Sequence, residues 1–138
     1  MKEIPKNIGE IMSSPVITVN SDTTVRDALL TMHKKNIGAV VVVSGDEPVG
    51  IITERDILSG IVLYENLPDQ PVSRIMSKKL ITCPPDTPIL RAFIIMHENR
   101  IRRLPVVDEG KLVGMVTERD LLYWILKLVG YESGQQKT

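Results

Sequence analysis

The sequence GIITERDIL (50–58) returns as GMVTERDLL (114–122), and both copies keep Gly-x-x-Thr-Glu-Arg-Asp. Aligned at this spacing without a gap, residues 11–58 match residues 75–122, with identical residues scattered along the whole alignment. So many shared positions in one register indicate an internal duplication. The two copies are therefore expected to share one fold, and any function carried by the motif is expected twice.

Each copy predicts the same order of elements, β-α-β-β-α, which makes the fold class α/β (α+β). Apolar and β-branched runs predict strands at 16–19, 39–43 and 48–53, and again at 80–82, 104–107 and 112–117. Pro88 suits the first helical position, which makes Thr87, and by register Thr23, the predicted N-cap of a helix. The helix stripes at i, i+3, i+4 and i+7 are Val25, Ala28, Leu29, Met32 and Ile89, Ala92, Phe93, Met96. A last helix begins at each Thr-Glu-Arg-Asp.

A unit of about fifty residues buries too little surface to be stable alone. We therefore expect the two repeats to pack sheet to sheet about a pseudo-twofold axis. The predicted organisation is a first repeat at 5–62, a linker at 63–71, a second repeat at 72–130 and a polar, frayed tail at 131–138.

The composition narrows the class of protein. With 138 residues, 43% hydrophobic and 25% charged, the chain predicts a packed globular core. The 17 basic residues balance the 17 acidic ones, which gives no general nucleic-acid or membrane signal. No apolar run reaches the roughly 18–20 residues that span a bilayer, and the N-terminus lacks the apolar centre of a secretion signal. We expect a soluble, cytoplasmic protein.

The ordered motifs resemble a known family. They are Met-Ser-x-x-x-Ile-Thr-Val from Met12, the capped helix, Ile-Arg-Arg-Leu-Pro-Val-Val-Asp at 101–108 and the repeated Gly-x-x-Thr-x-x-Asp. Together they resemble the CBS domain, named after cystathionine β-synthase, and the tandem resembles a stand-alone CBS pair, or Bateman module, over about residues 5–129. The resemblance implies a regulatory module that binds adenine nucleotides or other adenosyl ligands in clefts between its repeats. It also implies a homodimer and an unknown regulated protein partner.

The Thr-x-x-Asp pattern supports two roles. It is a capping-box pattern, in which Thr53 and Asp56 satisfy backbone groups at a helix start. A helix start also attracts phosphate, and a carboxylate can accept both protons of a ribose diol. The resemblance implies that the Thr contacts phosphate or ribose and the Asp takes the diol. The two roles can coexist.

The resemblance assigns residues to two clefts, with AMP or ATP as the first choice of ligand and S-adenosylmethionine or NAD also considered. The first cleft is predicted from Thr53, Asp56, Lys79, Leu80, Ile81, Ile101, Arg102, Arg103, Pro105 and Arg119. The second is predicted from Thr117, Asp120, Val16, Ile17, Ile37, Gly38, Ala39 and Arg55. The second should bind anionic nucleotides more weakly, because Gly38-Ala39 stands where the first has Arg102-Arg103. Alternatively, Arg100, Arg102 and Arg103 form a solvated helix end and strand edge.

The alternative function is a protein-interaction or scaffold module with vestigial clefts. Catalysis is not predicted, because no nucleophile–base set and no metal constellation is evident, and no cofactor is required. The matched His33 and His97 predict helix-surface positions rather than metal ligands. The lone Cys83 predicts a small buried hydrophobe rather than a nucleophile. The apolar helix at 121–129 packs within the chain, and part of its surface is expected to meet another subunit.

Overall fold

The computed structural model describes residues 4–130, so the polar tail at 131–138 lies outside the described residues. The chain folds into two compact units. The first-repeat unit is Val16–Leu80. The second-repeat unit joins the described N-terminal residues 4–15 to residues 81–130. No helix among the described residues is long and apolar enough to cross a membrane.

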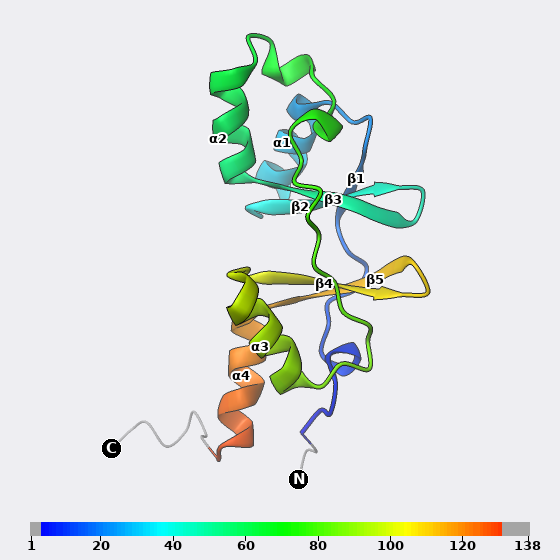
Figure 1. Ribbon diagram of the computed structural model, residues 1–138, viewed down its shortest axis with the longest axis vertical. Coiled ribbons are helices and arrows are strands. Elements are labelled where there is room, and N and C mark those ends of the chain that lie inside the picture. The colour runs from blue at the N-terminus through cyan, green and yellow to red at the C-terminus, as the bar shows by residue number, and fades with distance from the viewer. Residues whose placement is uncertain (1–3, 131–138) are drawn as a thin grey trace, which may run out of the picture. The chain divides into compact units, whose positions relative to one another are not determined.

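The first-repeat unit is a three-stranded sheet covered by helices (Figure 1). Its elements in order are β1 (Thr18–Asn20), α1 (Val25–Lys35), β2 (Ala39–Ser44), β3 (Glu47–Thr53) and α2 (Glu54–Leu63), followed by the 3-10 turns η2 (Leu67–Asp69) and η3 (Val72–Arg74). Strand β2 is central, parallel to β1 and antiparallel to β3. Both helices and both turns lie over one face of this sheet (Figure 1).

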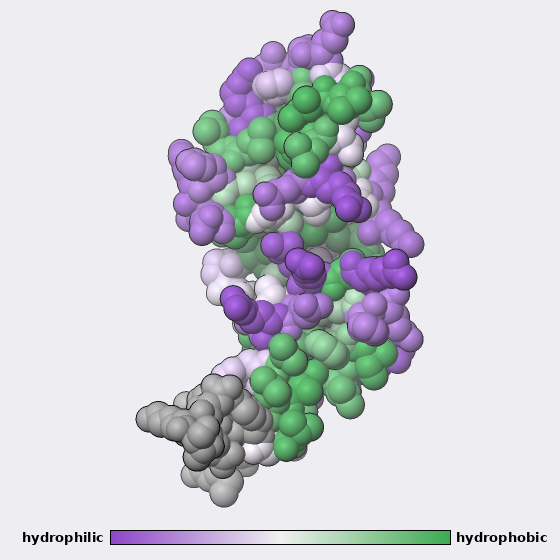
Figure 2. Space-filling view, turned by 90° about the vertical axis from the view of Figure 1, so that its left-hand side faces the viewer, coloured by the Kyte–Doolittle hydropathy of each residue, from purple (hydrophilic) through white to green (hydrophobic). Residues whose placement is uncertain are grey.

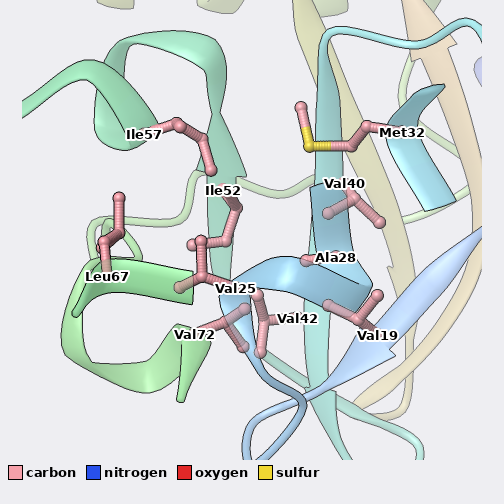
Figure 3. Packing of buried hydrophobic residues seen from close by; sticks show 10 residues of the cluster. All are labelled: Val19, Val25, Ala28, Met32, Val40, Val42, Ile52, Ile57, Leu67 and Val72. Carbon is pink, nitrogen blue, oxygen red and sulfur yellow. The ribbon is translucent and has the colours of Figure 1, made fainter. Parts of the chain in front are cut away.

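The core of this unit forms where α1, α2 and the two turns meet the sheet. Its buried members are Val19, Val25, Ala28, Met32, Val40, Val42, Ile52, Ile57, Leu67 and Val72, and their side chains converge in Figure 3. Complete burial of an aliphatic side chain of this kind contributes about 1.5–3 kcal/mol. Leu67, in the predicted linker, and Val72, at the start of the predicted second repeat, are both members of this core, so both turns are structural parts of the first-repeat unit.

The second-repeat unit repeats this plan with a two-stranded hairpin. Its elements are η1 (Ile8–Glu10), α3 (Ile89–Asn99), β4 (Arg103–Asp108), β5 (Lys111–Thr117) and α4 (Glu118–Leu128). Strands β4 and β5 pair antiparallel, with a register shift at Val106/Val107 like that at Val42/Val43 in the first repeat. The buried core is Ile8, Cys83, Ile89, Ala92, Met96, Leu104, Val106, Val116 and Leu121.

A short segment completes each unit, and the segment lies outside the strands and helices of that repeat. In the second-repeat unit, Ser13 exchanges backbone hydrogen bonds of 2.9 and 3.1 Å with Met115. In the first-repeat unit, Ser77 exchanges bonds of 3.0 and 2.9 Å with Ile51. The two contacts are equivalent, because Ser13 and Ser77 occupy matched positions of the duplication. Each unit is therefore completed by a segment that the duplication places at the start of the other repeat.

Most predicted elements are confirmed, with corrections at their ends. The run Leu80–Thr82 is not a strand, and only a single parallel bridge joins Cys83 to Val106. The prolines that follow, Pro84-Pro85, lack the N–H groups that would extend a ladder.

The predicted first caps are wrong by one residue. Helix α1 is capped by Thr24, whose side chain accepts from the Asp27 N–H, and α3 begins after Pro88, which is extended at ψ 147°. Thr87 instead donates its hydroxyl to the Pro84 carbonyl at 2.7 Å, which holds it in the turn before the helix. The stripe prediction fails at Leu29, which is exposed.

Candidate functional site

The first Thr-x-x-Asp pair is a complete capping box at the start of α2. The Asp56 Oδ2 atom accepts from the Thr53 N–H at 2.9 Å and from the Thr53 hydroxyl at 3.0 Å, and the Asp56 N–H donates to Thr53 Oγ1 at 3.3 Å. Both side chains are half-buried. Among the described residues, Asp56 Oδ1 has no hydrogen-bond partner. One oxygen of the carboxylate therefore holds the cap, while the other is free to accept a hydroxyl.

The second pair forms the same box at the start of α4, with a longer bond to its carboxylate. The Thr117 N–H donates to Asp120 Oδ2 at 3.3 Å, and the Asp120 N–H donates to Thr117 Oγ1 at 3.1 Å. Within the part of the chain that the structure describes, the Thr117 hydroxyl does not donate to the Asp120 carboxylate, unlike the pair in the first repeat. The carboxylate of Asp56 is thus held more firmly than that of Asp120. The capping role predicted from the sequence is confirmed for both pairs.

The helix starts offer fewer free N–H groups than a bare helix end. The Glu54 N–H donates to the Gly38 carbonyl at 3.2 Å, and the Glu118 N–H donates to the Arg102 carbonyl at 2.9 Å. The third helical N–H is taken by the capping Thr in each case. A phosphate near these helices would therefore depend on the helix dipole and on basic side chains more than on backbone donors.

The first strand of each hairpin begins directly beside the Thr-x-x-Asp pair of its own unit. Ala39 pairs with Thr53 in the first-repeat unit, and Arg103 pairs with Thr117 in the second. Arg102 and Arg103 therefore lie beside the start of the Thr117 helix in their own unit, through backbone contacts with Glu118 and Thr117. The sequence assigns both arginines to the cleft of Asp56. The sequence signal for this contact was the duplication, because Ala39 and Thr53 occupy the same positions in the first repeat as Arg103 and Thr117 do in the second.

Each predicted cleft takes residues from both compact units, so its assembly stays a prediction. The first-repeat unit holds Val16, Ile17, Ile37, Gly38, Ala39, Thr53, Arg55, Asp56, Lys79 and Leu80. The second-repeat unit holds Ile81, Ile101, Arg102, Arg103, Pro105, Thr117, Arg119 and Asp120. The cationic members Arg55, Lys79, Arg102 and Arg119 are exposed, whereas Arg103 is half-buried.

Cys83 has the environment of a core residue. Its side chain is 5% exposed within the core of the second-repeat unit. Burial raises the pKa of the Cys83 thiol above its ordinary value, although a hydrogen bond with Thr87 and the charge of Arg91 oppose the rise. A thiol that resists ionisation is a poor nucleophile, so the prediction of a small buried hydrophobe is confirmed.

The matched histidines lie on exposed helix surface. His33 is in the last turn of α1 and His97 is in the last turn of α3, where a cation is favoured by the helix dipole. Within residues 4–130, no three His, Cys, Asp or Glu side chains are grouped to hold a metal ion.

The family model of the CBS domain matches residues 8–63 and 72–127, which is most of the chain. The chain belongs to the CBS domain family. An uncharacterized protein of Methanopyrus kandleri is 41% identical over 119 residues, which are 84% of this chain and 61% of that protein. The CBS protein CBSX3 of Arabidopsis thaliana is 37% identical over 128 residues, 88% of this chain and 62% of its own length. The chain thus spans about three fifths of these relatives.

Two CBS structures with bound ligands share the fold. CBSX2 in complex with AMP matches with a TM-score of 0.79 at 25% identity, covering 91% of this chain and 99% of that one. The CBS domain pair of protein MJ0100, in complex with 5′-methylthioadenosine and S-adenosyl-L-methionine, matches with a TM-score of 0.75 at 31% identity. That match covers 96% of this chain and 100% of the other. The predicted family and the α/β repeat fold are confirmed.

Proposed function

We propose that the chain is a non-catalytic regulatory module that binds an adenosyl ligand, with AMP or ATP as the first choice. The observation that carries the proposal is the repeated half-buried Asp, which uses one carboxylate oxygen in its cap and leaves the other available. The AMP complex of CBSX2 and the S-adenosyl-L-methionine complex of the MJ0100 pair support an adenosyl ligand for this fold.

In the proposed binding mode the ribose hydroxyls donate to the free oxygen of an Asp carboxylate. Asp56 is the stronger candidate, because Thr53 fixes its carboxylate through two bonds to Oδ2. The phosphates are bound by basic side chains, which form charge-assisted bonds to phosphate oxygens. For Asp56 these are Lys79, Arg102, Arg103 and Arg119, as the sequence predicts, whereas the Asp120 set has Arg55 alone. We therefore propose weaker nucleotide binding at Asp120.

Thermal unfolding in the presence of AMP, ATP, NAD or S-adenosylmethionine tests this function. A ligand of the native state at one hundred times its Kd stabilises the protein by about 2.7 kcal/mol. We expect at least one of the four to raise the melting temperature. If none does, the alternative of a scaffold module with vestigial clefts is favoured.

We also propose that the protein acts as a homodimer. Helix α2 exposes Leu58, Ile61, Val62 and Leu63, with Val62 at 84% of its full accessibility. Figure 2, which faces the side where α2 and α4 are drawn in Figure 1, shows apolar side chains gathered over the surface of each unit. An apolar helix surface of this kind is typical of a subunit contact. Light scattering should give a dimer mass, and Val62→Glu should shift it toward the monomer; a monomer at micromolar concentration contradicts the proposal.

A further inference from the structure

An open cavity of about 520 Å³ lies in the second-repeat unit, at the end of α3 and the start of α4. Its apolar surface comes from the half-buried Ile101, because Met96, although it borders the cavity, is only 1% exposed. Its polar lining is exposed and consists of His97 and four charged residues of both signs, Glu98, Arg100, Arg102 and Glu118. Within the described residues, none of these side chains forms an ion pair with another. The cavity therefore presents unpaired positive and negative groups around an apolar patch.

Arg100 holds an unusual backbone conformation at this cavity. It ends α3 in the left-handed region, at φ 54° and ψ 42°, where its N–H donates to the His97 carbonyl. The matched residue of the first repeat is Asn36, at φ 53° and with the same type of bond. Asn adopts this conformation readily and Arg does not. The turn itself does not need an arginine, and a strained residue beside a cavity points to a function of its side chain.

Comparison of the two repeats shows which charged residues of this cavity have no counterpart in the first repeat. The first repeat has Asn36, Gly38 and Lys34 where the second has Arg100, Arg102 and Glu98. The remaining lining residues are kept, since Met32, His33, Ile37 and Glu54 match Met96, His97, Ile101 and Glu118. The second repeat has therefore gained two guanidinium groups and one carboxylate at a place where the scaffold is otherwise unchanged.

We propose that this cavity binds a small zwitterion of the α-amino acid class with an apolar side chain. Guanidinium groups bind carboxylates in bidentate fashion, so Arg100 suits the ligand carboxylate, whereas Arg102 belongs to the proposed nucleotide set. Glu98 and Glu118 suit the ammonium, and the half-buried Ile101 offers apolar contact to the side chain. A simple anion would meet the two glutamates and a simple amine would meet the two arginines, so each is opposed by like charge.

Titration of the full chain with leucine, followed by amide NMR, tests the proposal. Leucine should shift the amides of residues 96–102 and 118. Isocaproate, which lacks the ammonium, and isoamylamine, which lacks the carboxylate, should each bind at least roughly tenfold more weakly, since a charge-assisted bond is lost. Equal binding of isocaproate and leucine, or no leucine-dependent shift at these residues, overturns the proposal.

Arg100→Asn is the decisive variant, because Asn is the residue that the first repeat carries at this turn. It should weaken leucine binding by roughly 10- to 100-fold. AMP-dependent shifts should be unchanged, because Arg100 is outside the proposed nucleotide set, so failure of one proposal is distinguishable from failure of the other. The matched control Lys34→Asn removes a charge outside the cavity and should leave leucine binding unaltered. Unaltered binding in Arg100→Asn contradicts the assignment.

Discussion

Replacing Gly114 by alanine should destabilise the protein through one side chain, that of Met12. A Cβ atom at Gly114 meets the sulfur of Met12 and lies 2.6 Å from its Cγ and 3.0 Å from its Cβ. All three of the nearest atoms belong to Met12, which is half-buried against the core of the second-repeat unit. The new methyl group therefore has to displace this methionine.

The size of the effect is bounded on both sides. Overpacking of a core typically costs about 1–3 kcal/mol. The upper limit is the loss of the Met12 packing, and this should be below the roughly 2–5 kcal/mol of a fully buried Met→Ala change. In the double variant Met12→Ala/Gly114→Ala only the Cβ of residue 12 still crowds the new methyl group, at 3.0 Å, and a shift of a few tenths of an ångström relieves that contact. Its stability should then equal that of Met12→Ala alone within about 0.5 kcal/mol.

The equivalent glycine of the first repeat provides a matched comparison. A Cβ at Gly50 lies 2.6 Å from the Met76 sulfur but also 2.9 Å from the backbone carbonyl oxygen of Ser77, which accepts from the Ile51 N–H. Met76→Ala removes the first obstacle and not the second. Rescue of Gly50→Ala by Met76→Ala should therefore be incomplete, with a residual cost of about 1 kcal/mol or more.

Urea unfolding at a fixed protein concentration measures these energies from the transition midpoints and slopes. Trp124, which is partly buried against the core of the second-repeat unit, is a local fluorescence probe. Simple additivity of Met12→Ala and Gly114→Ala would refute the described packing of the N-terminal segment. So would a complete rescue of Gly50→Ala by Met76→Ala.

Three further predictions concern single residues. Arg100→Asn should raise the free energy of unfolding by roughly 0.5–1 kcal/mol, because Asn fits the left-handed turn, and Asn36→Arg should lower it by a similar amount in urea titrations. Thr53→Ala should cost about 0.5–2 kcal/mol through loss of the cap when no nucleotide is present, as measured by urea titration. Because the pKa of Cys83 is raised, the folded state holds the thiol proton more tightly than the unfolded state does. The stability that this proton contributes is complete below the unfolded pKa of 9.0 and is lost as the pH rises above it. In urea titrations above that pH, Cys83→Ala should therefore lose less stability than the wild type.

Local signals in the sequence were sufficient for the hairpins and for the helices at Thr-Glu-Arg-Asp. Strands β2 and β4 are continuous apolar runs, and each capping box lies within four consecutive residues, so neither depends on distant contacts. The first caps were misplaced because Thr23 and Thr24 are both plausible caps, and the choice follows from tertiary hydrogen bonds. Thr23 offers its carbonyl to the Val72 N–H, which anchors it outside the helix.

Long-range features were less accessible from the sequence. The pairing of Ser13 with Met115 joins residues far apart in the chain, and no local pattern indicates it. The cavity beside Arg100 was also missed as a site, because the sequence analysis weighed this arginine only as part of a solvated helix end. The signal was present in the alignment of the repeats, where Arg replaces Asn at the end of a helix.

Calorimetric titration of AMP into the wild type, Asp56→Asn and Asp120→Asn tests the central claim most directly. An Asn oxygen can still accept the Thr53 N–H, so the cap is largely kept while the charged diol acceptor is removed. We predict that Asp56→Asn weakens AMP binding by roughly tenfold or more, the equivalent of a charge-assisted hydrogen bond, and that Asp120→Asn has a smaller effect. Unchanged AMP affinity in a folded Asp56→Asn protein would contradict the account, and a larger loss in Asp120→Asn would assign Arg102 and Arg103 to the Thr117 helix start beside which they lie.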